Sequence, residues 1–234
     1  MYVLDGKFTL KSGTISGNAA GEGGGVCVGY NNREQEADAA FEMTGGTISG
    51  NETTYGGGVA VESSGTFKMS GGTISGNETT YGGGVLVNSG TFTMTGGTIG
   101  GTSADDANTA TDGGGVYIGS NGTFEMSGDD TAISGNKASS NGGGVYVSGG
   151  TFEMTDGTIS DNTVAASSST SGNGGGVYVS GGTFTMSGGT ISGNTISNTA
   201  KYCRGGGVYV SGTFTMEDGT ISNNTATGSG SSYH

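Results

Sequence analysis

The sequence predicts an all-β protein, a right-handed parallel β-helix (solenoid) of about eight coils with three short strands per coil. The stretch GGTISGNETTYGGGV starts at Gly45 and again, unchanged, at Gly71. This spacing is too short for a duplicated domain and indicates one unit of a stacked repeat. Three short phrases also recur in a fixed order, and their apolar residues alternate with polar ones, as in strands with one buried face.

Each of the three phrases occurs eight times, which predicts the number of coils. GGGV followed by x-Val or x-Ile has a truncated copy in the opening MYV, and its full copies start at Gly23, Gly56, Gly82, Gly113, Gly142, Gly174 and Gly205. Phe-x-Met, with Leu10 for Met in its first copy, starts at Phe8, Phe41, Phe67, Phe92, Phe124, Phe152, Phe184 and Phe214. Thr-Ile-Ser-x-Asn or a close variant is centred on Ile15, Ile48, Ile74, Ile99, Ile133, Ile159, Ile191 and Ile221.

Stacking these copies in register explains both the glycines and the core. Glycine pairs allow positive φ at tight corners between strands, and successive copies of one strand run in the same direction, so the three sheets are parallel. Each coil should rise about 4.8 Å, and the usual chirality of parallel crossovers predicts a right-handed coil. Phe67 should then lie on Phe92 and Phe124 in one continuous apolar column.

An asparagine three positions after the central isoleucine recurs in seven of the eight coils. These residues should bond rung to rung through their side-chain amides. Thr102 occupies this position in the coil that reads TIGG, so the column should be broken there. A ligand site would not be repeated in almost every coil, and the interpretation is therefore a structural ladder. Its members are Asn18, Asn51, Asn77, Asn136, Asn162, Asn194 and Asn224.

Composition and charge exclude several classes of function. The chain has 55 glycines, no proline and a formal net charge of −13, with seven Lys plus Arg against twenty Asp plus Glu. Such few, scattered cations cannot neutralise a run of phosphates, so neither nucleic acid nor a bare anionic membrane surface is an expected partner. No apolar run approaches the roughly 20 residues of a membrane span, and no direct membrane insertion is expected. No cofactor is expected.

Two outward surfaces could bind a ligand. The outward position of the GGGV strand holds four tyrosines, whose flat amphipathic rings suit a sugar face or a protein partner. They are Tyr117, Tyr146, Tyr178 and Tyr209. The equally weighted alternative is that tyrosine merely favours strands and stacks on itself. Threonine files on the other faces are similar to those of ice-binding proteins, a minor alternative because Glu42, Lys68, Glu125, Glu153 and Glu217 interrupt them.

The phrases GGGVYV, TFTM and GGTISGN resemble the right-handed parallel β-helix repeats of bacterial and archaeal adhesin-like surface proteins, and GGTI is similar to the GGAI element of polymorphic outer-membrane proteins. The resemblance covers residues 1–234, which we expect to be a single repeat domain and a segment of a longer array. It implies an extracellular or cell-surface location and a noncatalytic role as a stalk or a binding surface. The implied partner is a host or environmental glycan or a surface protein, with possible end-to-end or disulfide-linked self-association.

A polysaccharide-active enzyme, a lyase or glycoside hydrolase, is the alternative, because the same architecture carries such enzymes. Glu125 and Glu153 occupy outward positions of adjacent coils, at about the separation of a retaining carboxylate pair. Solvated glutamates are the simpler interpretation, because nothing in the sequence supplies a desolvating pocket. The only histidine is His234, so a catalytic or metal-binding histidine inside the fold is excluded. Paired acids at corners fit turn chemistry better than a calcium site.

The cysteines and the links between coils carry two further predictions. Cys27 lies in the second coil and Cys203 at the entry to the eighth, roughly 25–29 Å apart at the strand spacing. A disulfide needs Cα atoms within about 7 Å, so two free thiols are expected, both reachable by solvent. The links between each ladder asparagine and the next GGG, and the excursion GYNNREQEADAA, vary most in length and charge. Recognition could therefore reside in these loops.

Overall fold

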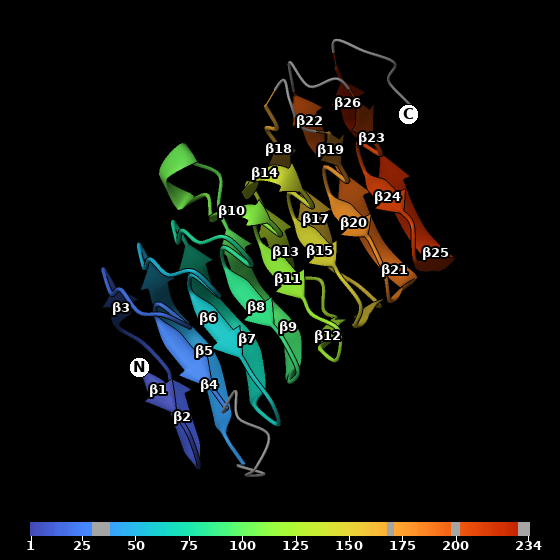
Figure 1. Cartoon of the computed structure of the whole chain (residues 1–234). Coiled ribbons are helices and arrows are strands. Elements are labelled where there is room, and N and C mark those ends of the chain that lie inside the picture. The colour runs from blue at the N-terminus through green and yellow to red at the C-terminus, as the bar shows by residue number, and fades with distance from the viewer. Residues whose placement is uncertain (30–37, 168–170, 198–201, 229–234) are drawn as a thin grey trace.

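The computed structural model describes residues 1–29, 38–167, 171–197 and 202–228. The chain is an all-β parallel solenoid of about seven turns, and its coils follow one another in chain order from one end of the molecule to the other (Figure 1). The described residues contain no α-helix and a single 3-10 turn, η1 (Ala104–Asp106). The predicted all-β parallel solenoid is confirmed. Eight copies of one strand enclose seven turns, which accounts for the small difference in coil number.

The first sheet contains the eight copies of the Val-x-Val strand, paired in parallel and in chain order. They are β1 (Tyr2–Val3), β4 (Val26–Val28), β6 (Val59–Val61), β8 (Val85–Val87), β11 (Val116–Ile118), β15 (Val145–Val147), β20 (Val177–Val179) and β24 (Val208–Val210). Each strand pairs without a register shift, because the preceding three glycines turn the chain identically in every full copy.

The Phe-x-Met and Thr-Ile-Ser phrases share the second sheet. Five coils form one continuous strand across both phrases: β5 (Ala40–Ser49), β7 (Thr66–Ser75), β9 (Thr91–Gly100), β21 (Thr183–Ser192) and β25 (Thr213–Ser222). In the other three coils the phrases form two strands: β2 (Lys7–Leu10) with β3 (Thr14–Ser16), β12 (Thr123–Met126) with β13 (Thr131–Ser134), and β16 (Thr151–Met154) with β17 (Thr158–Ser160). The pairing register shifts between the phrases, where the glycine pair bends the sheet.

The third sheet comes from the links, which the sequence presents as loops. Its strands are β10 (Thr109–Asp112), β14 (Lys137–Asn141), β18 (Thr163–Val164), β19 (Gly172–Asn173), β22 (Thr195–Ser197), β23 (Cys203–Arg204) and β26 (Thr225–Thr227). Their register continues toward the N-terminus through single bridges such as Glu52 to Glu78. The expectation of three sheets is thus met, but not with one sheet per phrase.

The core consists of the predicted columns. All eight phenylalanine rings stack along the solenoid, with centroid separations from 4.5 Å to 5.1 Å between neighbours. Met69 pairs with Met94 and Val59 with Val85 in the same way. These side chains are fully buried in the inner coils, whereas Met216 of the last described coil, which has a described neighbouring coil on one side, is 44% exposed. Burial therefore depends on a neighbour on each side.

The asparagine ladder is present, but it is not broken. Asn108, rather than Thr102, fills the expected gap: its Oδ1 accepts the backbone N–H and side-chain amide of Asn77 at 3.1 and 2.9 Å. Its own amide donates to Oδ1 of Asn136 at 2.9 Å. Six residues loop out through η1 between Gly101 and Asn108, so a count of three from Ile99 lands on the loop. The predicted break is wrong for this reason.

Two glycines show why the corner allows no other residue. Gly82 has φ +68°, and a Cβ there would lie 2.5 Å from the Val85 carbonyl oxygen. Gly84 has an ordinary φ, yet a Cβ would lie 2.6 Å from Cγ2 of Ile99 and 2.8 Å from the carbonyl oxygen of the next coil's Gly115. The first position therefore requires glycine for its positive φ, and the third requires it because the coils approach too closely for a Cβ.

Candidate functional site

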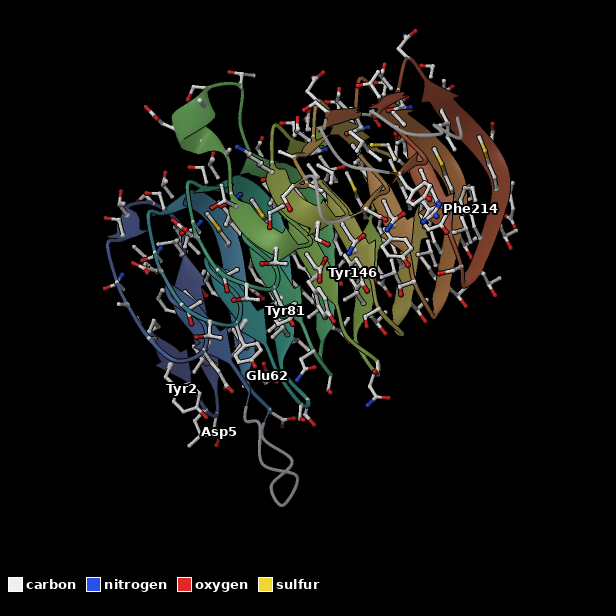
Figure 2. The ribbon with its side chains drawn as sticks, turned by 45° about the horizontal axis from the view of Figure 1, so that its top comes forward. Tyr2, Asp5, Glu62, Tyr81, Tyr146 and Phe214 are labelled. Atoms are coloured by element: carbon white, nitrogen blue, oxygen red, sulfur yellow. The ribbon has the colours of Figure 1, made fainter. Side chains whose placement is uncertain are left out.

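The four predicted tyrosines form a half-buried file on the first sheet. Tyr117, Tyr146, Tyr178 and Tyr209 are in register on adjacent strands, with ring centroids 5.0, 5.1 and 5.2 Å apart. Figure 2 shows Tyr2, Tyr81 and Tyr146 at successive positions along the length of the solenoid. The structure thus brings the predicted residues together as a continuous surface.

Two tyrosines from the links, Tyr55 and Tyr81, extend this file. Their rings stack at 5.7 Å with an interplanar angle of 11°, and Tyr81 meets Tyr117 edge-on at 5.3 Å. The result is one tyrosine stack over six coils: Tyr55, Tyr81, Tyr117, Tyr146, Tyr178 and Tyr209. Sequence reasoning missed its first two members, because they do not occupy the outward position of the strand.

The sequence signal for the two missed tyrosines is a pair of positions five residues apart, of which one holds tyrosine and the other does not. Tyr55 precedes a GGGV phrase whose outward residue is Ala60, and Tyr81 precedes one with Leu86. In the next coil the order is reversed, since Asp112 precedes and Tyr117 follows the glycines. The glycine corner brings the position before the glycines and the outward strand position to the same side of the solenoid. Each of these three coils has a tyrosine at one of the two positions. Covariation within the repeat could therefore have identified the whole stack.

The stack presents ring edges and hydroxyl groups rather than open faces. Parallel neighbours such as Tyr117 and Tyr146, inclined by only 14°, cover each other's faces. Burial raises the pKa of both phenols, and hydrogen bonds to Ser148 and Ser180 of the following coils partly offset this effect. A ligand along this part of the surface would therefore meet a polar edge backed by aromatic rings.

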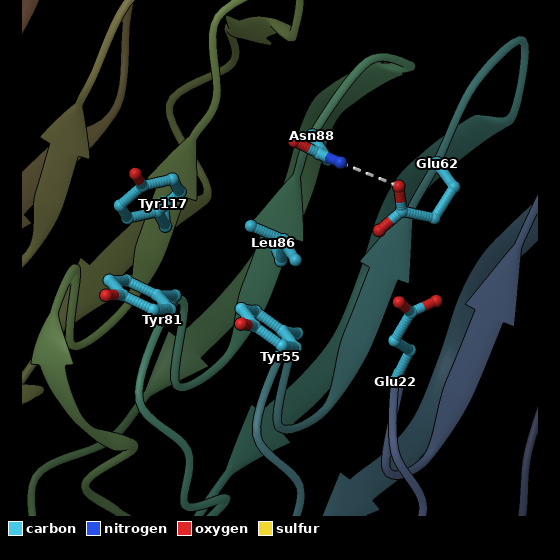
Figure 3. A pocket seen from close by; sticks show the side chains of 7 residues that line it. All are labelled: Glu22, Tyr55, Glu62, Tyr81, Leu86, Asn88 and Tyr117. Atoms are coloured by element: carbon cyan, nitrogen blue, oxygen red, sulfur yellow. Dashed lines mark hydrogen bonds between the residues drawn. The ribbon is translucent and has the colours of Figure 1, made fainter. Parts of the chain in front are cut away.

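At its N-terminal end the stack opens into a groove with a volume of about 360 Å³. We call it the N-terminal groove; Figure 3 shows its lining residues, Glu22, Tyr55, Glu62, Tyr81, Leu86, Asn88 and Tyr117. Glu62 follows β6 directly, is only 3% exposed, and accepts a hydrogen bond from Nδ2 of Asn88 at 2.9 Å. Burial raises the pKa of the Glu62 carboxyl, the Asn88 bond opposes this, and the nearby charge of Glu22 adds to it.

The C-terminal end of the stack has the opposite charge. The guanidinium of Arg204 lies 6.0 Å from the ring centroid of Tyr209 and 5.4 Å from that of Tyr202. These are distances at which a cation is attracted to an aromatic face. The stack therefore ends at Arg204 on its C-terminal side and at the carboxylates of Glu22 and Glu62 on its N-terminal side.

The carboxylate pair considered for catalysis lies outside this surface. Glu125 and Glu153 are in register on β12 and β16, as predicted, and both are exposed. Oε2 of Glu125 accepts a hydrogen bond from the Thr93 hydroxyl at 3.2 Å. Within the described ranges, no group of three or more His, Cys, Asp or Glu residues could hold a metal ion.

The threonine files lie on the second sheet. One runs in register through six coils, in the order Thr66, Thr91, Thr123, Thr151, Thr183 and Thr213. In the first two coils this file holds Lys7 and Ala40. The adjacent outward file mixes threonine with charged residues, in the order Thr9, Glu42, Lys68, Thr93, Glu125, Glu153, Thr185 and Thr215. Nζ of Lys7 lies 2.6 Å from Oε1 of Glu42 and joins the two files. The sheet thus carries one regular threonine file beside an interrupted one.

The cysteines are free thiols, but neither is reachable by solvent. Cys27 occupies the outward strand position and is nevertheless only 6% exposed, because it packs in a cluster with Ala60 and Leu86. Cys203 lies in β23 of the third sheet and is 0% exposed. The predicted accessibility is wrong because Cys27 packs against the outward residues of neighbouring strands, and Cys203 lies in the apolar cluster of the third sheet.

Most of the excursion after Val28, parts of the two longest links and His234 lie outside the described residues. Among the residues described, none forms a helix with the length and apolar character needed to cross a membrane. Comparisons with protein-family models, curated proteins and solved structures find no match.

Proposed function

We propose that this chain is a noncatalytic extracellular segment of an adhesin-like surface protein, a rigid spacer whose tyrosine stack binds a glycan or a protein. The observation that supports binding is the stack itself, which keeps six half-exposed rings in line over six coils although the chain must draw them from two different positions. Aromatic side chains with polar tips suit surfaces that contact a partner and water together.

The spacer role is supported by the columns of the core. Phenylalanine and asparagine columns run along the molecule and join every coil to the next, so bending the solenoid would separate stacked rings or break buried hydrogen bonds. Loops can vary at one corner while the columns continue, as the insertion before Asn108 shows.

The test is retention on immobilised glycans and surface proteins with a pair of variants. Tyr146→Ser with Tyr178→Ser removes two rings and should abolish binding while lowering the melting temperature by no more than a few degrees. Tyr146→Phe with Tyr178→Phe keeps the rings, removes only the hydroxyls and should weaken the binding less than the serine pair does. Full retention by the serine variant would place recognition elsewhere, and release of unsaturated products or new reducing ends from a polysaccharide would establish the enzyme class instead.

End-to-end self-association belongs to the same proposal. At the C-terminal coil Val210, Met216 and Ile221 are 37%, 44% and 37% exposed, and they continue columns that are buried elsewhere. A further coil in the same register would cover them. Sedimentation should show concentration-dependent association that Met216→Glu prevents, and a protein that stays monomeric at high concentration would contradict this part of the proposal.

A further inference from the structure

The two ends of the tyrosine stack differ in charge: a cation lies at the C-terminal end and carboxylates lie at the N-terminal end. Arg204 places a cation over the ring of Tyr209 at the C-terminal end. At the N-terminal end the ring of Tyr55, which is 44% exposed, faces a groove whose other side carries the carboxylates of Glu22 and Glu62 (Figure 3). A cation held between an aromatic face and a carboxylate is attracted by both.

We propose that the N-terminal groove is a binding site for a primary ammonium group carried on a small ring or chain. The ammonium would donate hydrogen bonds to Glu62, and the attached carbon skeleton would lie against the rings of Tyr55 and Tyr81 and the side chain of Leu86. This inference does not depend on glycan binding by the remainder of the stack.

The chemistry of the lining supports a cation over a neutral ligand. Glu62 is a nearly buried carboxylate, and burying such a charge is unfavourable unless an opposite charge or several donors compensate it. Its partner in the groove is the neutral amide of Asn88, and the charge that acts on it most directly is a second carboxylate, Glu22. A bound ammonium would relieve both effects.

The size and shape of the groove fit a compact ligand. Its volume of about 360 Å³ is at the lower end of the range for small-molecule sites. Cys27, Ala60 and Leu86 form an apolar cluster on this face, where the later coils have tyrosine. Smaller side chains at these positions leave the space that the groove occupies.

The experiment compares charged and uncharged ligands of equal shape by isothermal titration or ligand-observed NMR at neutral pH and low salt. Cyclohexylammonium should bind at least about ten-fold more tightly than cyclohexanol, and added salt should reduce this preference. Glucosamine against glucose forms the second arm. A charge preference in both arms indicates that the site accepts amino sugars as well as simple amines, whereas a preference in the first arm alone restricts it to aliphatic amines.

Variants assign the effect to the groove. Glu62→Gln keeps an acceptor for Asn88 and should remove the charge preference, whereas Glu153→Gln, at an exposed position of β16, should leave it unchanged. Tyr55→Leu should weaken the binding of both ligands of a pair. Equal affinity for charged and uncharged ligands, or a preference that survives Glu62→Gln in a variant with unchanged circular dichroism, would overturn the proposal.

The pH dependence provides a further measurement. Titratable groups facing Glu62 are Glu22, the lining tyrosines and Cys27, whose pKa is raised to about 12 by burial, so the thiol stays neutral. Because burial raises the pKa of Glu62, the preference for cyclohexylammonium should disappear as the pH falls through that raised pKa. In Glu62→Gln this transition should be absent, and a transition that persists in the variant would contradict the assignment.

Discussion

Replacing Asn108 by alanine tests the continuity of the asparagine ladder most directly. Asn108 is fully buried and makes four side-chain hydrogen bonds: two from Asn77, one to the Ile74 carbonyl and one to Asn136. The alanine variant leaves the Asn77 backbone N–H and Oδ1 of Asn136 without these partners. Each buried polar group left unsatisfied costs about 1–3 kcal/mol, so unfolding free energy should fall by about 2–6 kcal/mol.

Urea unfolding followed by circular dichroism measures this loss, with Thr102→Ala as the control. Thr102 is exposed in the inserted loop, and its change should stay within about 0.5 kcal/mol. Because stacked repeats can unfold in parts, hydrogen exchange at the Asn77 amide gives a local readout and should lose protection only in the Asn108 variant. Similar stabilities for the two variants, with that amide still protected, would refute a ladder that passes through Asn108.

Three other predictions concern the core, the corner and the thiols. Phe152→Ala should cost about 3–5 kcal/mol in urea melts as a cavity in the phenylalanine column, whereas Thr185→Ala, on the outward side of the same sheet, should cost no more than about 0.5 kcal/mol; equal losses would show that the register is wrong. Gly84→Ala should lower stability by at least about 1–3 kcal/mol, because its methyl group would overlap the next coil, and a melting temperature equal to that of the parent would contradict the close approach. Neither cysteine should react with a thiol reagent in the native protein at pH 8, and both should react in denaturant, since both are buried and the pKa of Cys27 is raised to about 12. Rapid labelling of the native protein would show that the covering residues open readily.

The parts of the fold that follow from strict periodicity were predictable from the sequence. Phe124 and Phe152 are identical, inward and in register, and a period of two with glycine corners leaves no other arrangement that buries them. Asn108 was not predictable by counting, because a loop of unknown length precedes it and only the hydrogen bonds identify it as a ladder residue. Asn108 therefore has the same place in the stack as the other ladder residues, although its spacing from the preceding isoleucine differs.

Residue spacing also predicted only part of the candidate site. The strand pattern correctly placed Tyr146 outward, but it could not show that Tyr81 of a link continues the stack. It also predicted Cys27 to be reachable, although it packs with Ala60 and Leu86 of the neighbouring coils. Both errors concern side chains of different coils that meet only when the coils stack. The N-terminal groove is a further example, since its lining comes from several coils.

The inserted loop between Gly101 and Asn108 has a practical consequence for protein engineering. The chain leaves the solenoid after Gly101, makes the turn η1, and returns at Asn108 with the hydrogen-bond ladder intact. A foreign peptide grafted in place of residues 102–107 would start and end on fixed points of a rigid scaffold. Equivalent corners of neighbouring coils lie one strand spacing away, about 4.8 Å. Several short epitopes could therefore be displayed side by side at defined intervals, with each one exchangeable independently of the others.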